Sequence, residues 1–265
     1  MTGRNVVRVR RLPGASSAAV HRLDLDDATA VVLRRYLWKG FLESEPDAPA
    51  REVDCVHFAR AAGLAVPDVI AVDLAGDDIG DGVPAILMSF LRGRVVAVPN
   101  ISRLAEVAAS IHAIDADQLG HDYFAWYDSE MMTPPPGSSS PELWDRAIEI
   151  RRTQLAEYTP TLIHRDFHPG NVMWLRGQLS GVVDWANACR GPFGCDLAHC
   201  RSNLRELAGI ATGDEFVAAY QSLTGDELHP YWVLAGHLEH SHRHWNPERL
   251  ARDEPDLALA VSELG

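Results

Sequence analysis

The chain of 265 residues carries 24 Lys and Arg against 37 Asp and Glu, and its formal net charge of −13 at pH 7 argues against nucleic acid as a partner. No apolar run approaches the ~20 residues that a membrane-spanning helix requires, and residues 1–14 lack the apolar stretch of a secretory signal. The four cysteines form no CxxC pair, so we expect reduced thiols in the cytoplasm and no membrane partner.

The first third of the chain has the pattern of β-strands around one helix. Three segments alternate or are rich in β-branched residues, and "DLDD" between the second and the third indicates a hairpin turn. A helical spacing of apolar residues starts at Arg51 and stops at Gly63 and Pro67. Two further strand segments follow. The pattern predicts a twisted antiparallel sheet with one helix, in the order strand 6–14, strand 18–25, strand 28–37, helix 51–67, strand 68–74 and strand 84–91.

After Gly93 the chain becomes mainly helical. Amphipathic patterns predict one helix before and one after a proline-rich loop at 134–141. Residues 171–185 have the pattern of two short strands about a turn near Arg176 and Gly177. The remaining chain again has a helical pattern and contains no internal repeat.

The sequence "LIHRDFHPGNVMW" at 162–174 places an acid, a tight turn and an amide close together. Phosphoryl transfer needs a carboxylate that orients the attacking hydroxyl, and oxygen ligands that hold Mg²⁺ on the donor phosphates. Asp166 is the candidate catalytic base, and Asn171 is a candidate metal ligand beyond the Pro-Gly turn. Asp184, at the end of the following hairpin, is the candidate second ligand.

The order of loop, strand, turn, strand and aspartate matches the H-R-D-x-x-x-x-N and D-F-G layout of protein kinases. The sequences "HRDFHPGNVMW" and "GVVDWANACRGPFGCDLAHC" resemble the aminoglycoside phosphotransferase family, small-molecule kinases with a protein-kinase-like fold. The resemblance implies an α+β fold of two lobes, with ATP and Mg²⁺ as cofactors. We expect a nucleotide-binding lobe at 1–91 and a mainly helical catalytic and acceptor-binding lobe at 92–265.

The resemblance also implies roles for other residues of the loop. His168 corresponds to the loop histidine of the family in the catalytic site, and His164 is a supporting residue. Asp196 corresponds to the acid that holds the backbone amides of the loop. The chain departs from the family at Arg165, where the family usually has glycine and protein kinases have arginine. A side chain there adds bulk or an ion pair beside the base.

The N-terminal lobe contains a partial match to the kinase strand V-A-I-K. In "VVLR" Arg34 stands where the lysine that contacts the α- and β-phosphates is expected, and Glu52 heads the helix that follows. Arginine binds phosphate, but its planar group differs from the point charge of lysine. The alternative is that Arg34 is an ordinary arginine on an edge strand. Arg35 points to the opposite face and is the weaker candidate.

Two segments are expected to contact the rest of the nucleotide. "LPGASSAAV" has one glycine in place of G-x-G-x-x-G. Gly14 could form its turn, and Ser16 and Ser17 could offer amides or hydroxyls to phosphate. Taken alone, the segment is better explained as a plain hairpin turn, and its place before "VVLR" is what makes it a candidate. In "ILMSFLRG" the backbone groups of Ser89 to Leu91 are expected to meet adenine at the hinge between the lobes.

Three other clusters are candidates for sites. His237, His240 and His244 fall on one helix face, which allows a metal site but more often marks histidines of an acceptor pocket or of the surface. The cysteines near His199 match no zinc pattern and are expected to be buried apolar residues. The aromatic segment 123–132 is a candidate wall or lid of the acceptor site, or part of the core.

The sequence thus predicts an ATP- and Mg²⁺-dependent phosphotransferase acting on a hydroxyl of a small molecule. The resemblance implies an aminoglycoside-like antibiotic as acceptor, and hence antibiotic resistance; a polycation also suits the acidic C-terminal two thirds. Amino alcohols, sugars and macrolides are the other acceptor classes. A protein kinase is disfavoured because only 11 residues separate Asp184 from Asp196, which leaves no room for an activation loop. A nucleotide-binding pseudokinase is the second rival, supported by Arg34 and the glycine-poor loop.

Overall fold

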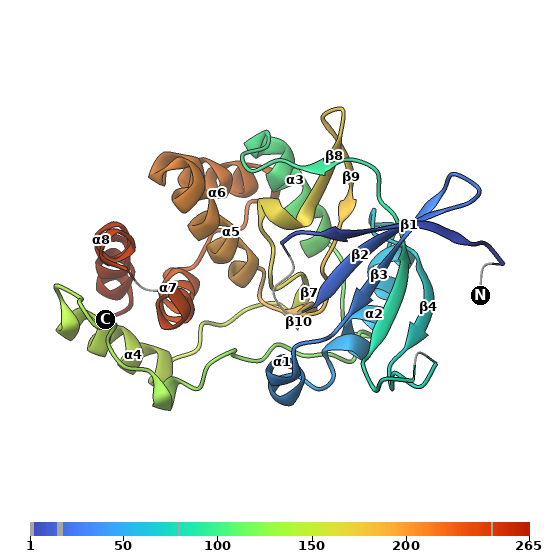
Figure 1. Ribbon diagram of the computed structural model, residues 1–265. Coiled ribbons are helices and arrows are strands. Elements are labelled where there is room, and N and C mark those ends of the chain that lie inside the picture. Colours follow the sequence, from blue (N-terminus) through green and yellow to red (C-terminus); the bar gives the residue numbers. More distant parts are fainter. Residues whose placement is uncertain (1–2, 15–17, 79, 245) are drawn as a thin grey trace. The chain divides into compact units, whose positions relative to one another are not determined.

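The internal contacts of the chain divide it into two units. The computed structural model describes residues 3–14, 18–78, 80–244 and 246–265, without the side chains of 240–244 (Figure 1). The antiparallel sheet and the helical region predicted from the sequence are both present, so the α+β fold class is confirmed. Unit 1 comprises Met1–Val96 and Gly170–Ala188, and unit 2 comprises Ala97–Pro169 and Cys189–Gly265.

A five-stranded antiparallel sheet forms the larger part of unit 1, with the strands in the order β1-β2-β3-β5-β4 (Figure 1). β3 therefore has a neighbour on each side: its Val31 pairs with Leu23 of β2 and with Ser89 of β5. Alternating and β-branched residues favour this arrangement because successive side chains point to opposite faces of a strand. The strands are β1 Val6–Leu12, β2 Ala19–Leu25, β3 Ala30–Arg35, β4 Val69–Asp73 and β5 Ala85–Ser89.

Two helices follow β3 in unit 1, α1 Lys39–Ser44 and α2 Ala48–Ala61. The sequence predicted only α2, and placed its start at Arg51. The helix begins earlier because Pro49 is compatible with a first turn, where its missing N–H costs nothing. α1 has six residues and no side-chain cap, and a helix that short leaves no periodic pattern to detect. α2 contacts β4 and β5 and closes the core on that face.

A three-stranded sheet completes unit 1, in the order β6-β8-β9. The turn between β8 and β9 consists of Arg176 and Gly177, whose φ angles are 53° and 77°. Positive φ at both positions is what a two-residue hairpin loop prefers, so the turn predicted here is confirmed. The strands are β6 Arg94–Val95, β8 Val172–Leu175 and β9 Gln178–Val182.

The β8–β9 hairpin and the residues after it are bonded to the helical side of unit 1. The amide of Val182 donates to the carbonyl of Ala65 at 2.8 Å, and Arg51 Nε donates to the carbonyl of Ala186 at 2.7 Å. The sequence-based division after residue 91 assigned this hairpin to the second lobe, whereas its contacts lie with unit 1. Asp184 is therefore fixed on the same unit as the five-stranded sheet.

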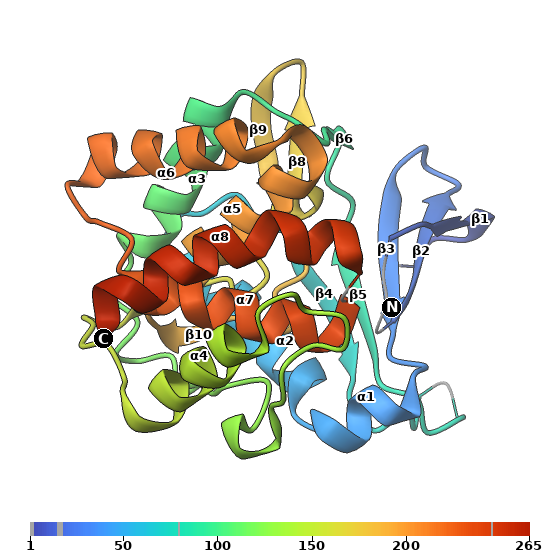
Figure 2. The ribbon, with the colours of Figure 1, turned by 90° about the vertical axis from the view of Figure 1, so that its left-hand side faces the viewer.

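Unit 2 is built mainly from helices. Figure 2 shows α6 beside α3 and α8 beside α7, and both pairs are in contact. Asn100 caps α3 by accepting the amide of Arg103, and Asn246 caps α8 by accepting the amide of Arg249. The helices are α3 Ile101–His112, α4 Pro141–Thr153, α5 Phe193–Ala208, α6 Ile210–Thr224, α7 Pro230–His244 and α8 Pro247–Leu264. A two-stranded sheet pairs β7 Thr161–Ile163 with β10 Cys189–Gly191, and a short 3₁₀ turn lies at Ser129–Met131. A second 3₁₀ turn, Pro169–Asn171, lies where the chain passes from unit 2 to unit 1.

The apolar core of unit 2 gathers between α4, α7 and α8. Trp144, Ile150, Leu234 and Leu257 are almost completely buried there. Each such side chain stabilises the fold by about 1.5–3 kcal/mol relative to exposure. Glu254 of α8 accepts the indole N–H of Trp144 at 3.1 Å, which satisfies the one polar group of that ring. Within the described ranges, no helix combines the length and the apolar character needed to cross a membrane.

β1 is an edge strand of the five-stranded sheet and is exposed along nearly its whole length. Val6, Val7 and Val9 are 49%, 65% and 59% exposed. The register against β2 shifts between Val6 and Arg8, which marks an irregularity of the bulge type. Arg8 and Arg10 place two cationic side chains along this edge.

Candidate active site

The loop that follows β7 is held by a buried carboxylate from α5. Asp196, in the first turn of α5, is completely buried. Its Oδ2 accepts the backbone N–H of His164 and its Oδ1 accepts that of Arg165, both at 2.7 Å. Burial alone would raise the pKa of Asp196, but the hydrogen bond and charge of His112 lower it. The ionised carboxylate fixes the backbone immediately before Asp166.

Asp166 lies half-buried in unit 2 beside histidines. His199 Nε2 is 3.1 Å from Asp166 Oδ1, and the ring centroids of His168 and His199 are 5.8 Å apart. Burial alone would raise the pKa of Asp166, but the contact with His199 and the charges of His168 and His164 bring it below its ordinary value. The carboxylate is therefore ionised at neutral pH, and an ionised carboxylate can accept a hydrogen bond and then a proton from an alcohol.

Sequence reasoning missed the contact between His199 and Asp166. His199 lies three residues after Asp196 on α5, and residues at that spacing share a helix face. Because Asp196 was already assigned to the loop, the three-residue spacing could have indicated that His199 also faces the loop. The ring of Trp126 meets the His199 ring edge-on, with centroids 6.3 Å apart. The aromatic segment 123–132 thus reaches the side chains around Asp166, and its use as an acceptor wall stays a prediction.

Arg165 adopts a backbone conformation that glycine adopts at no cost. Its φ is 67°, in the left-handed region, where a side chain other than that of glycine costs about 1–2 kcal/mol. This gives a physical reason why the resembling family usually has glycine at this position. The strain is offset by what the side chain of Arg165 contacts.

The guanidinium of Arg165 is buried in an aromatic box. Its carbon lies 4.5 Å from the ring centroid of Tyr123, 5.4 Å from that of Phe124 and 4.3 Å from that of Trp126. Glu239 of α7 approaches it at 3.9 Å. Cation–π contacts of this kind contribute about 0.5–2 kcal/mol each. Arg165 therefore fastens the aromatic segment to the loop that carries Asp166.

In unit 1, Arg34 lies between two carboxylates. Its Nε is 3.1 Å from Glu52 Oε2, and its terminal nitrogen is 2.6 Å from Asp184 Oδ1. Arg34 is 4% exposed and lies on β3, an inner strand, so the alternative of an ordinary edge-strand arginine is wrong. Tyr36 donates its hydroxyl to Glu52 on the same buried side. Arg35 instead pairs with the exposed Asp81.

The protonation states in this cluster follow from burial and charge. Burial alone would lower the pKa of Arg34, but Asp184 and Glu52 together raise it well above its ordinary value, so the guanidinium is permanently charged. Burial raises the pKa of Glu52; Arg34 opposes this, and the charge of Asp184 adds to it. One fixed cation thus stabilises two carboxylates.

Asn171 lies opposite Val183, the residue before Asp184, at the base of the β8–β9 hairpin. The amide of Val183 donates to the carbonyl of Asn171 at 2.9 Å. Asn171 is 7% exposed, the side chain of Asp184 is 27% exposed, and the φ of Asp184 is 68°. Carboxylate and amide oxygens are the ligands that Mg²⁺ takes from proteins, so this pair fits the predicted metal, with one oxygen of Asp184 also bound by Arg34.

The segments expected around the rest of the nucleotide have mixed outcomes. Gly14 has φ of 103° in the connection between β1 and β2, as a turn requires, while Ser16 and Ser17 lie outside the described residues. The backbone N–H of Ser89 already donates to Asp68 O at 2.8 Å. This N–H is therefore engaged within the sheet, and of the two named hinge residues Leu91 is the better candidate for a contact with adenine.

The histidine face of α7 has a structural explanation at His237. Its Nε2 is 2.7 Å from Asp256 of α8, and it is 5% exposed. The side chains of His240 and His244 lie outside the described residues. Within the described part of the chain, no three His, Cys, Asp or Glu side chains are grouped as metal ligands. All four cysteines are free thiols. Of the three near His199, Cys189 and Cys200 are buried as predicted, whereas Cys195 is partly exposed.

The chain is similar to known proteins over most of its length. The model of the phosphotransferase enzyme family matches residues 8–231. The homoserine kinase of Methylobacterium radiotolerans is 29% identical over 164 residues, which are 56% of this chain and 50% of that protein. The homoserine kinase of Neisseria meningitidis serogroup B is 30% identical over 152 residues, or 54% of this chain and 50% of that protein. The chain spans about half the length of these curated relatives.

Solved structures share the fold. Aminoglycoside phosphotransferase APH(4)-Ia matches with a TM-score of 0.66 at 19% identity, over 98% of this chain and 95% of that one. An aminoglycoside-3'-phosphotransferase of type VIII gives a TM-score of 0.59 at 19% identity, over 98% and 94%. A thermostable mutant of the first, in a ternary complex with AMP-PNP and hygromycin B, gives 0.65 at 18% identity, over 97% and 94%.

Proposed function

Because the chain belongs to the phosphotransferase enzyme family, we propose that it transfers the γ-phosphoryl group of ATP to a hydroxyl group of a small molecule. The observation that carries the proposal is the position and the ionisation of the Asp166 carboxylate. Its carboxylate is half-buried, its pKa is lowered through His199, and it follows a backbone fixed by Asp196. A positioned, ionised carboxylate is what a kinase needs to orient an attacking hydroxyl.

In the proposed reaction each group has one task. Asp166 accepts the hydrogen bond and then the proton of the acceptor hydroxyl, while His199 keeps the carboxylate in place. Asn171 and Asp184 would supply oxygen ligands to Mg²⁺, which when bound neutralises charge on the phosphates. Arg34 would contact the α- and β-phosphates, in the place of the kinase lysine. Positioning and charge neutralisation then account for the rate.

For the acceptor, we propose a small hydroxylated amine. Two observations support this class: sequence relatives at 29% and 30% identity are named homoserine kinases, and the structural neighbours are aminoglycoside phosphotransferases. Homoserine and aminoglycosides both carry an ammonium group beside an alcohol. The net charge of −13 favours a cationic acceptor over an anionic one. An antibiotic acceptor, and with it a role in resistance, is the narrower form of this proposal.

One observation favours a second candidate function, a nucleotide-binding module without turnover. Arg34 binds Asp184, which is the predicted metal ligand, at 2.6 Å. A module that never bound metal could retain this pair permanently. In an active enzyme Asp184 must either leave Arg34 or contact Arg34 and the metal at the same time when the metal–nucleotide complex binds. Mg²⁺ dependence of ATP binding therefore separates the two functions.

The test is a screen for phosphorylated products by mass shift. The purified chain, with Mg-ATP, is offered homoserine, hygromycin B, an amino alcohol, a sugar and a macrolide, beside the Asp166→Asn variant. We expect a product 80 Da heavier (one HPO₃ group, ~80 Da) from an amine-bearing acceptor. We expect the variant to bind nucleotide normally and to turn over about 10²–10⁴-fold more slowly.

Three outcomes would count against the proposal or part of it. Full turnover by Asp166→Asn would remove Asp166 from the mechanism. Stabilisation of the chain by ATP without any product from the whole panel, and without a requirement for Mg²⁺, would favour the binding module. If only a sugar or a macrolide were phosphorylated, the proposed kinase activity would be supported and the proposed amine-bearing acceptor would be contradicted.

A further inference from the structure

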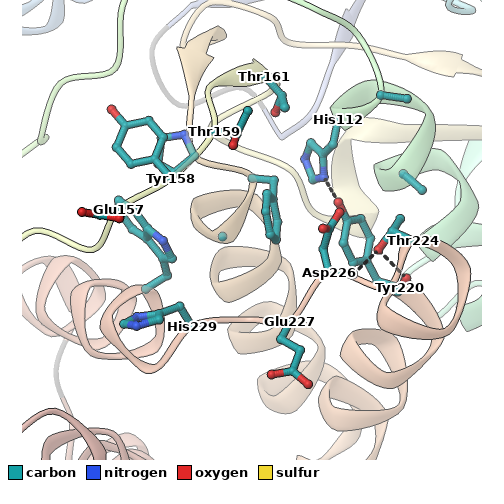
Figure 3. Close-up of a pocket in the computed structure, with 16 residues that line it drawn as sticks. His112, Glu157, Tyr158, Thr159, Thr161, Tyr220, Thr224, Asp226, Glu227 and His229 are labelled. Carbon is teal, nitrogen blue, oxygen red and sulfur yellow. Dashed lines mark hydrogen bonds between the residues drawn. The ribbon is translucent and has the colours of Figure 1, made fainter.

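Unit 2 contains a cavity of about 840 Å³ that the proposed reaction does not use (Figure 3). It is lined by the ends of α3 and α6, the starts of α5 and α7 with residues just before α7, residues 157–159, and Thr161 at the start of β7. Its volume is within the range of small-molecule sites, which is about 300–1,000 Å³. Figure 3 shows His112 and Tyr220 on one side of the cavity, with Glu157, Tyr158 and His229 on the other. None of the lining residues belongs to the candidate catalytic or metal groups.

The charges around the cavity favour a cation. Its lining includes three carboxylates, Glu157, Asp226 and Glu227, and contains no lysine or arginine. The start of α5 also contributes to the lining, and the first turn of a helix favours an anion. However, Asp196 occupies that first turn with an ionised carboxylate, which offsets the partial positive charge. The balance at the cavity is therefore negative.

Aromatic rings supply the apolar part of the lining. Phe193 stacks on Tyr220 with centroids 5.8 Å apart, and Tyr158 meets Trp232 edge-on at 5.8 Å. A Cβ at Gly194 would lie 2.3 Å from Trp232 Cδ1, so glycine at that position is what allows the indole to lie against the start of α5. Aromatic faces next to carboxylates are the chemistry that binds organic cations, through cation–π attraction and charge.

The inner wall of the cavity is connected to the loop that carries Asp166. His112 is 6% exposed; its Nδ1 is 2.9 Å from the hydroxyl oxygen of Tyr220, and its Nε2 is 3.1 Å from Asp196 Oδ2. A carboxylate only accepts, so Nε2 donates to Asp196, while Nδ1 and the hydroxyl group of Tyr220 form the second hydrogen bond of the ring. The same Oδ2 accepts the backbone N–H of His164.

The aromatic rings of Phe193 and Tyr220 connect this chain of hydrogen bonds to the cavity surface. Phe193 lies 6.0 Å from the ring of His112 and stacks on Tyr220, and both Phe193 and Tyr220 line the cavity. A ligand that packs on Phe193 therefore touches the rings that orient His112. Any change in the direction of His112 alters the hydrogen bonds that Asp196 can make to the loop.

We propose that this cavity is a second binding site, that it takes a small organic cation with an apolar body, and that occupancy is transmitted to the amides of His164 and Arg165 through His112 and Asp196. The binding step does not depend on the proposed kinase activity. It can therefore be tested without nucleotide and without an acceptor.

The binding test compares three probes that share a phenyl group: benzyltrimethylammonium, benzyl alcohol and benzoate. Titration calorimetry at constant ionic strength is expected to show saturable binding of the cation and at least about ten-fold weaker binding of the other two. The double variant Asp226→Asn/Glu227→Gln is expected to lose about ten-fold in affinity for the cation. The control Glu106→Gln/Glu215→Gln removes the same charge from exposed positions outside the cavity and is expected to bind like the wild type.

The transmission test follows hydrogen exchange of the His164 and Arg165 amides by NMR. Saturation with the cation is expected to change both exchange rates by about two-fold or more, and benzoate is expected to leave them unchanged. Equal affinity in the Asp226/Glu227 variant and the wild type would overturn the site. Equal binding of the three probes would overturn the charge preference. Cation binding with unchanged exchange of both amides would overturn the transmission.

Discussion

Asp184 in unit 1 and Asp166 in unit 2 are both partly buried carboxylates, but they are paired with different kinds of basic side chain. Asp184 pairs with Arg34, whose raised pKa keeps it charged at every physiological pH. Asp166 pairs with His199, through one ring nitrogen 3.1 Å away. The first carboxylate is therefore held by a guanidinium of fixed charge, and the second by one imidazole contact within a cluster of histidine and tryptophan rings.

The difference matches the chemistry proposed for each side. A metal ligand has to stay ionised and in place, and a fixed guanidinium serves that purpose. A carboxylate that accepts a hydrogen bond and a proton from an alcohol has to be held in position, which the contact with His199 does. The two units thus hold their carboxylates by different means, and three substitutions test that difference.

The largest effect is expected from Arg34→Met. It leaves Glu52 and Asp184 without their common cation in a buried position, which should cost about 3–5 kcal/mol of unfolding free energy. Urea unfolding measures this loss. Arg34→Lys keeps the charge and is the matched control, with a smaller expected loss. If the methionine variant were as stable as the lysine variant, Arg34 would not be the stabilising cation of unit 1.

A smaller effect is expected from His199→Gln. The pKa of folded Asp166 lies below its unfolded value of about 3.9, so its ionised form adds stability that is present above that pH and is lost as the pH falls below it. The variant should therefore lose about 1–2 kcal/mol at pH 6 and less at pH 3, where the wild type has begun to lose this contribution. Unfolding at both pH values gives the comparison. A loss that is equal at both would show that His199 acts by packing alone.

The smallest effect is expected from Arg165→Gly, beside Asp166. Glycine loses the contacts with the aromatic box but relieves the left-handed backbone, so we expect a net change within about 1 kcal/mol. Arg165→Ala loses the same contacts without that relief and should be about 1–2 kcal/mol less stable than the glycine variant. Thermal unfolding of the pair measures the strain directly. Equal stability of the two would show that the strain is absent.

Local patterns were enough to predict most of unit 1 and the residues of the loop. Alternating side chains predicted the strands of the five-stranded sheet, and a Gly at the second turn position predicted the β8–β9 turn. The spacing of Asp166, Asn171 and Asp184 identified the candidate groups because those side chains have to sit at fixed points on a turn and a hairpin. Their roles stay predictions until activity is measured.

What was missed depends on contacts between distant segments. β7 and β10 have three residues each, too few for a periodic pattern, and their pairing joins positions 161–163 to 189–191. The bond from Arg51 to the carbonyl of Ala186 assigns the hairpin to unit 1, and nothing in either local sequence indicates it. To predict that Arg34 lies on an inner strand, one needs the order of the strands in the sheet, and the sequence left that order open.

The unpaired edge of β1 affects self-association of the protein at high concentration. Unpaired strand amides with exposed valines are a template on which a second copy can add a strand. Two copies meeting along this edge would bring cationic side chains of one β1, such as the exposed Arg8, close to those of the other, although Asp24 already pairs with Arg10 at 3.0 Å. The irregular register near Val6 would also disturb the pairing. Resistance to self-association then depends on repulsion between like charges, and so weakens as added salt screens that repulsion.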